Sequence, residues 1–130
     1  MRFVILRKSD ATMESDTPAS PELIAAIRQY DNEMRKAGVL VAVERLQPSS
    51  RGTRVRLSKG EFTTLDGPFS ETKELIAGIT MIDVESKEEA IAWIKRCPTL
   101  CGGDVEAEFE IRQGLDCGGV PPRLPRLTQR

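Results

Sequence analysis

Two segments of this chain are apolar on both faces, and they constrain its fold more than any other feature. Residues 2 to 7 (RFVILR) and residues 39 to 44 (VLVAVE) each predict a β-strand with large apolar side chains at consecutive positions. Because successive side chains of a strand point to opposite faces of its sheet, both segments need cover on two sides. The fold therefore has to bury both faces of a sheet.

A helix is predicted between these two strands, after a polar connection from Lys8 to Ser20. Ser20 is a typical N-cap, and Pro21 fits the first helical position, where its missing N–H costs nothing. Gly38 is the expected end of the helix. The apolar residues recur three and four positions apart and form a seam along one side: Leu23, Ile27, Tyr30, Met34 and Ala37.

The second half of the chain repeats the order of strand, helix and strand after a hairpin. The expected elements are hairpin arms at residues 54 to 58 and 61 to 65, a strand at 76 to 84, a helix from Ser86 to Pro98 and a strand at 105 to 111. Gly78 within its strand indicates a bulge or the close approach of another backbone. Ser86 and Glu89 form a capping-box pattern, in which each side chain satisfies the other residue's N–H.

This order of elements predicts a ferredoxin-like α+β fold, with one antiparallel sheet and both helices on the same face. We expect a single domain over residues 1 to 112 and a mobile tail over residues 113 to 130. Two helices leave the second face of the sheet bare, which is unusual for a monomer. A second copy packed sheet against sheet, as a homodimer, is the interpretation we favour, with a ligand cavity between the sheets. The alternative is that the hairpin at residues 53 to 65 folds back over that face.

The composition argues against several classes of protein. The chain of 130 residues has 19 basic and 20 acidic side chains, and its net charge of −1 provides no overall field for nucleic acid or a membrane surface. The N-terminus has only four apolar residues in a row, too few for a secretory signal or a membrane span. Three cysteines, an odd number, argue against a secreted disulfide framework. We therefore expect a cytoplasmic protein that binds neither nucleic acid nor membrane.

The absence of histidine limits the chemistry further. Cys97 and Cys101 would supply only two of the four ligands of a structural zinc site, so we expect reduced thiols, no metal and no cofactor. Acid–base chemistry falls to carboxylates, lysines, Tyr30 or the thiols. Whether the protein is an enzyme is left open, and one candidate chemistry is that of a lyase or isomerase that uses a carboxylate.

Polar chemistry is concentrated in one constrained stretch, Asp66-Gly67-Pro68-Phe69 followed by Ser70-Glu71-Thr72-Lys73-Glu74. Gly67 admits backbone angles closed to other residues and Pro68 restricts the residue before it, so the two would hold Asp66 and Phe69 in fixed directions. A carboxylate held beside an apolar ring can act as a general base, and Asp66 is therefore the candidate catalytic residue. The alternative is structural: Asp66 accepts backbone N–H bonds in a turn, and Phe69 fills the core.

The candidate ligand-binding residues are Arg45, Phe69 and Lys73. Lys73 would pair with Asp66 or with an anionic group of a substrate, and Arg45 begins a run without acidic residues that extends to Gly60. Within this run Arg54 and Arg56 share one strand face and could hold a carboxylate or phosphate. The alternative is a charged edge hairpin that discourages aggregation.

The stretch from Asp66 to Glu74 resembles the signature of the DGPF group within the YCII-related family. Gly38-Val39-Leu40-Val41 with Leu46-Gln47-Pro48, and Arg96-Cys97-Pro98 before Gly102-Gly103, match the same group in the same order. The resemblance covers about residues 1 to 112. It implies a dimeric α+β barrel of ferredoxin-like units, in small bacterial proteins of mostly unassigned function, some encoded near sigma-factor genes. The wider group resembles an enzyme scaffold in which a His and an Asp face a cleft; Asp66 would be the counterpart of that acid, whereas this chain has no His.

Three hypotheses for the function follow. The first is a small-molecule enzyme or binding protein, with Asp66 as base or anchor and Arg45 or Lys73 as the partner of an anionic group. The second is a non-catalytic regulatory module that acts through a protein partner such as a sigma-factor system, as the resemblance implies. The third is a dimer that binds no ligand.

Overall fold

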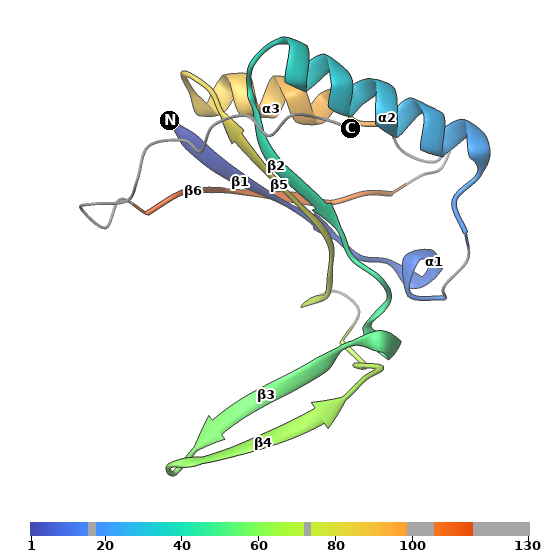
Figure 1. The fold of residues 1–130 in the computed structure, drawn as a ribbon, viewed down its shortest axis with the longest axis vertical. Coiled ribbons are helices and arrows are strands. Elements are labelled where there is room, and N and C mark those ends of the chain that lie inside the picture. Colours follow the sequence, from blue (N-terminus) through green and yellow to red (C-terminus); the bar gives the residue numbers. More distant parts are fainter. Residues whose placement is uncertain (16–17, 72–73, 99–105, 116–130) are drawn as a thin grey trace.

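The structure, a computed structural model, describes residues 1–15, 18–71, 74–98 and 106–115. Its elements are, in chain order, β1 (Arg2–Lys8), α1 (Ala11–Glu14), α2 (Pro21–Lys36), β2 (Leu40–Arg45), the 3-10 turn η1 (Ser49–Arg51), β3 (Thr53–Ser58), β4 (Glu61–Asp66), β5 (Ile76–Asp83), α3 (Lys87–Lys95) and β6 (Phe109–Gln113). Figure 1 shows α2 and α3 in one layer, a four-stranded sheet against them, and the β3–β4 hairpin apart from both. None of the helices in these ranges combines the length and the apolar character that crossing a membrane requires.

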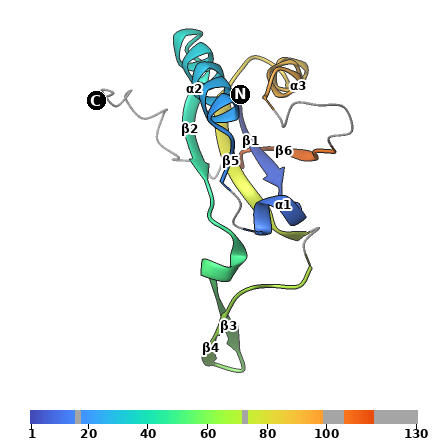
Figure 2. The same cartoon turned by 90° about the vertical axis from the view of Figure 1, so that its right-hand side faces the viewer.

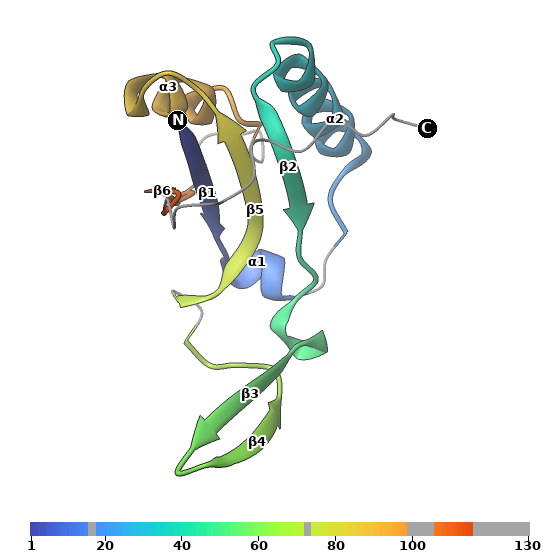
Figure 3. The ribbon, with the colours of Figure 1, turned by 60° about the vertical axis from the view of Figure 1, so that its left-hand side comes forward.

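The sheet has the strand order β2-β5-β1-β6, and every neighbouring pair within it is antiparallel. Each β-α-β half contributes one central and one edge strand, and α2 and α3 lie on the same face of the sheet (Figures 1 and 3). This is the ferredoxin-like α+β fold that the order of elements predicted. The fold-class prediction is confirmed.

The hydrophobic core lies between the helices and one end of the sheet. It joins Phe3 and Ile5 of β1 to Tyr30 and Met34 of α2, and its other buried members are Val39, Ile82, Val84 and Ala90. Met34 and Ile82 are fully buried. Since burial of a side chain of this size contributes about 1.5–3 kcal/mol, this cluster provides the main stabilisation of the helix–sheet contact.

The predicted ends of α2 are confirmed. The Ser20 hydroxyl accepts the N–H of Leu23 at 3.1 Å, and Pro21 occupies the first helical position. After the helix, Gly38 has a φ of 77°, a left-handed conformation that glycine adopts without a steric penalty. Ala37 of the predicted seam is exposed, because the helix ends at Lys36 and Ala37 is already its C-cap.

The start of α3 follows the capping-box pattern in part. The Ser86 hydroxyl accepts the N–H of Glu89 at 3.1 Å, as expected. The Glu89 carboxylate accepts the N–H of Glu85 at 2.9 Å, and not that of Ser86 itself. Both ends of the pair still satisfy a backbone donor at the helix N-terminus.

Gly78 lies where β5 contacts both of its neighbours. The register between β1 and β5 shifts at Arg7 and Lys8, next to Gly78. A Cβ added to Gly78 would lie 3.3 Å from the Glu44 carbonyl oxygen and 3.7 Å from Cγ of Arg45. Both a bulge and a close backbone approach are therefore present, and the missing side chain leaves room for Arg45.

Two elements differ from the expectation. Helix α1 lies within the segment predicted to be a polar connection, where the Asp10 carboxylate caps it by accepting the N–H of Met13 at 2.8 Å. A single helical turn carries no apolar seam, so periodicity could not reveal it. The last strand begins at Phe109, with residues 106–108 outside it and residue 105 outside the described ranges. It ends at Gln113, one residue past the expected domain boundary, and the expected tail beyond residue 115 lies outside the described part of the chain.

The sheet face opposite the helices carries alternate apolar side chains of β1 and β5. By the register of the two strands, Val4, Leu6, Ile79 and Met81 share this face. The β3–β4 hairpin does not fold back over it: every residue of both strands is exposed, and the hairpin projects away from the sheet (Figures 1 and 2). The alternative that the hairpin at residues 53 to 65 folds back over this face is therefore wrong. The homodimer needs a second copy of the chain and stays a prediction.

Candidate functional site at the base of the hairpin

The turn from Asp66 to Phe69 lies directly against η1, and Gly67 is what permits this contact. A Cβ on Gly67 would lie 1.8 Å from the Ser49 carbonyl oxygen, so a larger residue cannot enter unless the backbone moves. The N–H of Gly67 donates to the Gly52 carbonyl at 2.9 Å, and the Gly67–Pro68 peptide bond is cis. The constrained turn predicted from the sequence is thus held by close backbone packing.

Ser49 joins this turn to the N-terminal part of the chain. Its hydroxyl accepts the N–H of Phe69 at 3.1 Å and donates to a carboxylate oxygen of Glu14. Its own N–H donates to the other carboxylate oxygen of Glu14 at 3.0 Å. Because hydrogen bonds to a charged acceptor contribute about 1.5–3 kcal/mol each, α1, η1 and the turn form one connected unit.

A cleft of about 550 Å³ opens beside this unit. Its lining includes Arg45 from β2, Arg54 from β3 and Phe69 from the turn. The guanidinium carbon of Arg54 lies 3.9 Å from the centre of the Phe69 ring, a cation–π contact. Arg54 forms no ion pair with any residue of the described ranges. The other charged lining residues are Glu14, Glu44, Arg51 and Glu74.

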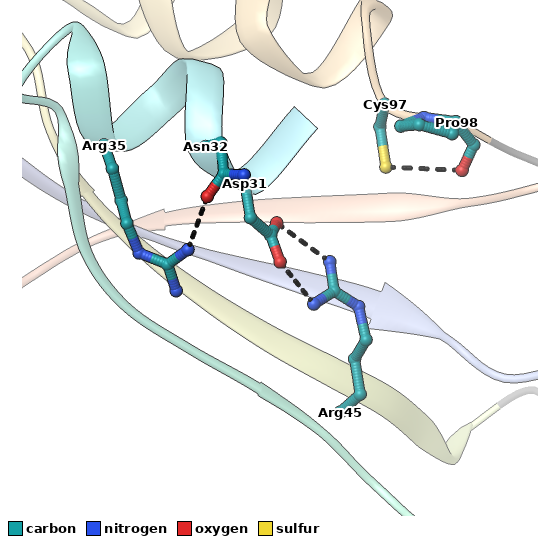
Figure 4. Close-up of polar contacts among 6 residues, drawn as sticks. All are labelled: Asp31, Asn32, Arg35, Arg45, Cys97 and Pro98. Carbon is teal, nitrogen blue, oxygen red and sulfur yellow. Dashed lines mark hydrogen bonds and ion pairs between the residues drawn. The ribbon is translucent and has the colours of Figure 1, made fainter. Parts of the chain in front are cut away.

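Arg45 stands between this cleft and a larger cavity on the helix side of the sheet, and it lines both. Its two terminal nitrogens donate to the two carboxylate oxygens of Asp31 at 2.9 and 3.2 Å, the bidentate pair drawn in Figure 4. The Asp31 side chain is 10% exposed and that of Arg45 is 43% exposed. A buried carboxylate therefore fixes the direction of a guanidinium that still reaches water.

The predicted site residues come together only in part. Arg45 and Phe69 line the same cleft. Asp66 is exposed at the end of β4, where its carboxylate accepts the hydroxyl of Thr53 at 2.8 Å, and it lies outside the lining of both cavities. This contact ties the two ends of the hairpin together, and the catalytic role of Asp66 stays a prediction. Lys73 lies outside the described residues.

Three residues that shape the site carried no functional assignment from the sequence: Glu14, Asp31 and Ser49. Asp31 directly follows Tyr30 of the apolar seam. Because a buried carboxylate is unfavourable unless it is paired, an acid at this position indicates an ionic partner elsewhere in the chain. Glu14 and Ser49 gave no comparable signal, because 35 positions separate them and each is ordinary in its own segment.

Burial raises the pKa of two side chains, Tyr30 and Cys97, on the helix side of Arg45. Desolvation raises the pKa of Tyr30, whose hydroxyl donates to the Trp93 carbonyl at 2.8 Å. Desolvation also raises the pKa of the Cys97 thiol, against the opposing effect of Arg45 and Arg7. Both groups are therefore uncharged at neutral pH. Within the described ranges, no group of three or more cysteine, aspartate or glutamate side chains could hold a metal ion.

Comparison with known protein families identifies the family of this chain. The YCII-related domain matches residues 1–113 of this chain. The chain belongs to the YCII-related family. An uncharacterized protein of Rhizobium meliloti (strain 1021) is 40% identical over 78 residues, and the match spans 60% of this chain and 60% of that relative. The name of this relative gives no activity, so a function for this YCII-related protein has to be argued from its own cleft.

Proposed function

We propose that this YCII-related protein binds a small anionic molecule in the cleft at the base of the hairpin, within the cytoplasm. The observation that carries the proposal is the convergence of Arg45, Arg54 and Phe69 on one cleft, with the Arg54 guanidinium held over the Phe69 ring. A guanidinium in a fixed orientation binds a carboxylate or phosphate through two N–H groups at once. The cleft volume of about 550 Å³ falls within the range of small-molecule sites.

The charges of the lining narrow the class of ligand. Arg54 has no carboxylate partner within the described ranges, whereas Arg45 is paired with Asp31. Arg54 is therefore the primary anchor for the anionic group. The carboxylates of Glu44 and Glu74 on the same lining are available as hydrogen-bond acceptors, so an anion that also carries hydroxyl or amino groups matches the lining better than a simple anion.

A matched pair of arginine variants tests this proposal. Arg56 lies two residues after Arg54 on the same face of β3 but outside the cleft. In a thermal-shift screen of carboxylates and phosphate monoesters, a ligand should raise the Tm of the wild type and of Arg56→Gln, but not that of Arg54→Gln. A shift that survives in Arg54→Gln, or that is lost equally in both variants, contradicts the proposal.

The role of Asp66 is tested in the same screen. If Asp66 is a general base or an anchor for the ligand, Asp66→Asn abolishes turnover or binding and leaves the Tm close to that of the wild type. A lower Tm with ligand binding intact would give Asp66 only its structural role, the hydrogen bond from Thr53.

We also propose that the chain forms a homodimer. Two apolar surfaces support this: the half-buried sheet face of β1 and β5 that the helices do not cover, and one face of the hairpin, where Val55, Leu57 and Phe62 are 65%, 60% and 72% exposed. Light scattering should give a dimer mass for the wild type and a weaker dimer for Phe62→Ser. A monomeric wild type would refute the homodimer, and the hairpin face would then favour the second hypothesis, a regulatory module with a different protein partner.

A further inference from the structure

The apolar seam of α2 is packed over only half of its length. Tyr30 and Met34 belong to the hydrophobic core. Ile27 and Leu23, one and two turns before Tyr30, are only half-buried and line the cavity between the helices and the sheet. This cavity has a volume of about 620 Å³. Since the seam of a helix in a protein interior normally meets close-packed side chains, an apolar seam that lines a cavity needs an explanation.

Strands of the sheet and helix α3 also contribute side chains to the cavity wall. Ile5 of β1, Ile94 of α3 and Phe109 of β6 line it together with the seam of α2. Ile5 and Tyr30 are members of the core as well, so the cavity directly continues the core toward α1. The wall is therefore predominantly apolar, and strands, helices and the loop residues Pro18, Leu46 and Pro98 all contribute to it.

The cations on this wall already have partners within the chain. Arg45 has its bidentate contact with Asp31. Arg7 donates to the Lys8 carbonyl at 2.6 Å, and its guanidinium carbon lies 5.2 Å from the centre of the Phe109 ring. An anionic ligand would have to displace one of these partners, and a buried charge without a partner is strongly unfavourable.

The other ionisable groups on the wall are Glu44, Tyr30, Cys97 and Asp10, and Glu44 is exposed to water at the end of β2, so its charge is not buried in the cavity. Tyr30 and Cys97 are uncharged at neutral pH, and the Tyr30 hydroxyl already donates to the Trp93 carbonyl. The Asp10 carboxylate accepts the N–H of Met13 at the start of α1 and lies 3.8 Å from the guanidinium of Arg7. Figure 4 shows Cys97 and Arg45, which both line this cavity, and Asp31, the partner of Arg45.

We propose that the helix-side cavity is a second binding site, distinct from the anionic cleft, and that it takes an uncharged apolar molecule. Such a molecule removes its own surface and the side chains of Leu23, Ile27 and Phe109 from water without disturbing an ion pair. The volume of about 620 Å³ suits a compact ligand of two or three rings or a short acyl chain.

Two probes with the same apolar body test the ligand class. N-phenyl-1-naphthylamine is uncharged, and 1-anilinonaphthalene-8-sulfonate differs from it by a sulfonate. The uncharged probe should bind the wild type with increased fluorescence, at least about tenfold more tightly than the sulfonate, and should raise the Tm. Failure of the uncharged probe to bind, or tighter binding of the sulfonate, overturns the proposal.

Two tryptophan variants test the place of binding. Ile27→Trp fills the cavity and should weaken binding of the uncharged probe by about tenfold or more. Ile24→Trp adds the same ring at a position that is 41% exposed and outside the cavity lining, and it should bind the probe as the wild type does. If Ile27→Trp lacks the native far-UV circular dichroism, Leu23→Trp on the same wall replaces it. Unchanged binding in the cavity-filling variant refutes the site.

Discussion

The pair formed by Arg45 and Asp31 should respond unequally to the loss of its two members. Arg45→Met leaves the Asp31 carboxylate, 10% exposed, without its bidentate partner. Loss of one partner of a fully buried pair costs about 3–5 kcal/mol, and the 43% exposure of Arg45 reduces this to about 2–3 kcal/mol. Asp31→Asn leaves a guanidinium that water can reach and an amide oxygen that still accepts one hydrogen bond, so it costs about 1 kcal/mol.

Thermal unfolding followed by circular dichroism, at one protein concentration, measures this asymmetry. At about 3 °C per kcal/mol for a domain of this size, the Tm should fall by about 6–9 °C in Arg45→Met and by about 3 °C in Asp31→Asn. In the Asp31→Asn background, Arg45→Met should lower the free energy of unfolding much less than it does in the wild-type background. Arg35→Met is the control, because Arg35 bonds Asn32 on the exposed side of the same helix. An Asp31→Asn loss equal to or larger than that of Arg45→Met would refute the reasoning.

Two further predictions follow from the close contacts described above. Gly67→Ala places a Cβ 1.8 Å from the Ser49 carbonyl oxygen, so it should cost about 1–3 kcal/mol and speed hydrogen exchange at the Phe69 amide, whereas Gly114→Ala, with its nearest atom at 3.6 Å, should be neutral. Burial raises the pKa of the Cys97 thiol in the folded state above its unfolded-state value of about 9.0. The contribution of this thiol to the free energy of unfolding is therefore present below that pH and is lost as the pH rises above it. Urea midpoints measured on both sides of that pH should fall less in Cys97→Ala than in the wild type, and equal slopes would contradict the assignment.

The parts of the fold that could be predicted are those set by local chemistry. The limits of α2 were predicted correctly because an N-cap, a proline and a glycine marked its ends independently. The sheet followed from the order of elements, since right-handed connections leave few arrangements of two β-α-β halves. The contact at Gly78 was also predictable, because glycine inside a strand usually marks a close backbone.

The parts that could not be predicted depend on contacts between distant segments. The seam of α2 is continuous in the sequence, and the orientation of the helix over the sheet decides that Met34 is packed while Leu23 lines a cavity. The place of Asp31 beside the apolar seam indicates that it has a partner, but no local pattern selects Arg45, 14 positions later, as that partner. The sequence did mark Phe69 and Arg45 as ligand-binding candidates, but their meeting with Arg54 is a property of the folded chain.

The hairpin leaves the sheet between two strands that are themselves hydrogen-bonded neighbours. The chain departs after Arg45 and returns at Ile76, and the N–H of Leu46 donates to the Ala77 carbonyl at 2.8 Å, which closes the sheet behind the departure point. The exposed hairpin of β3 and β4 thus contributes no side chain to the core at Met34 and Ile82. A change in the length of this hairpin should therefore leave the hydrophobic core of the ferredoxin-like body intact, even where it alters the cleft at the base of the hairpin.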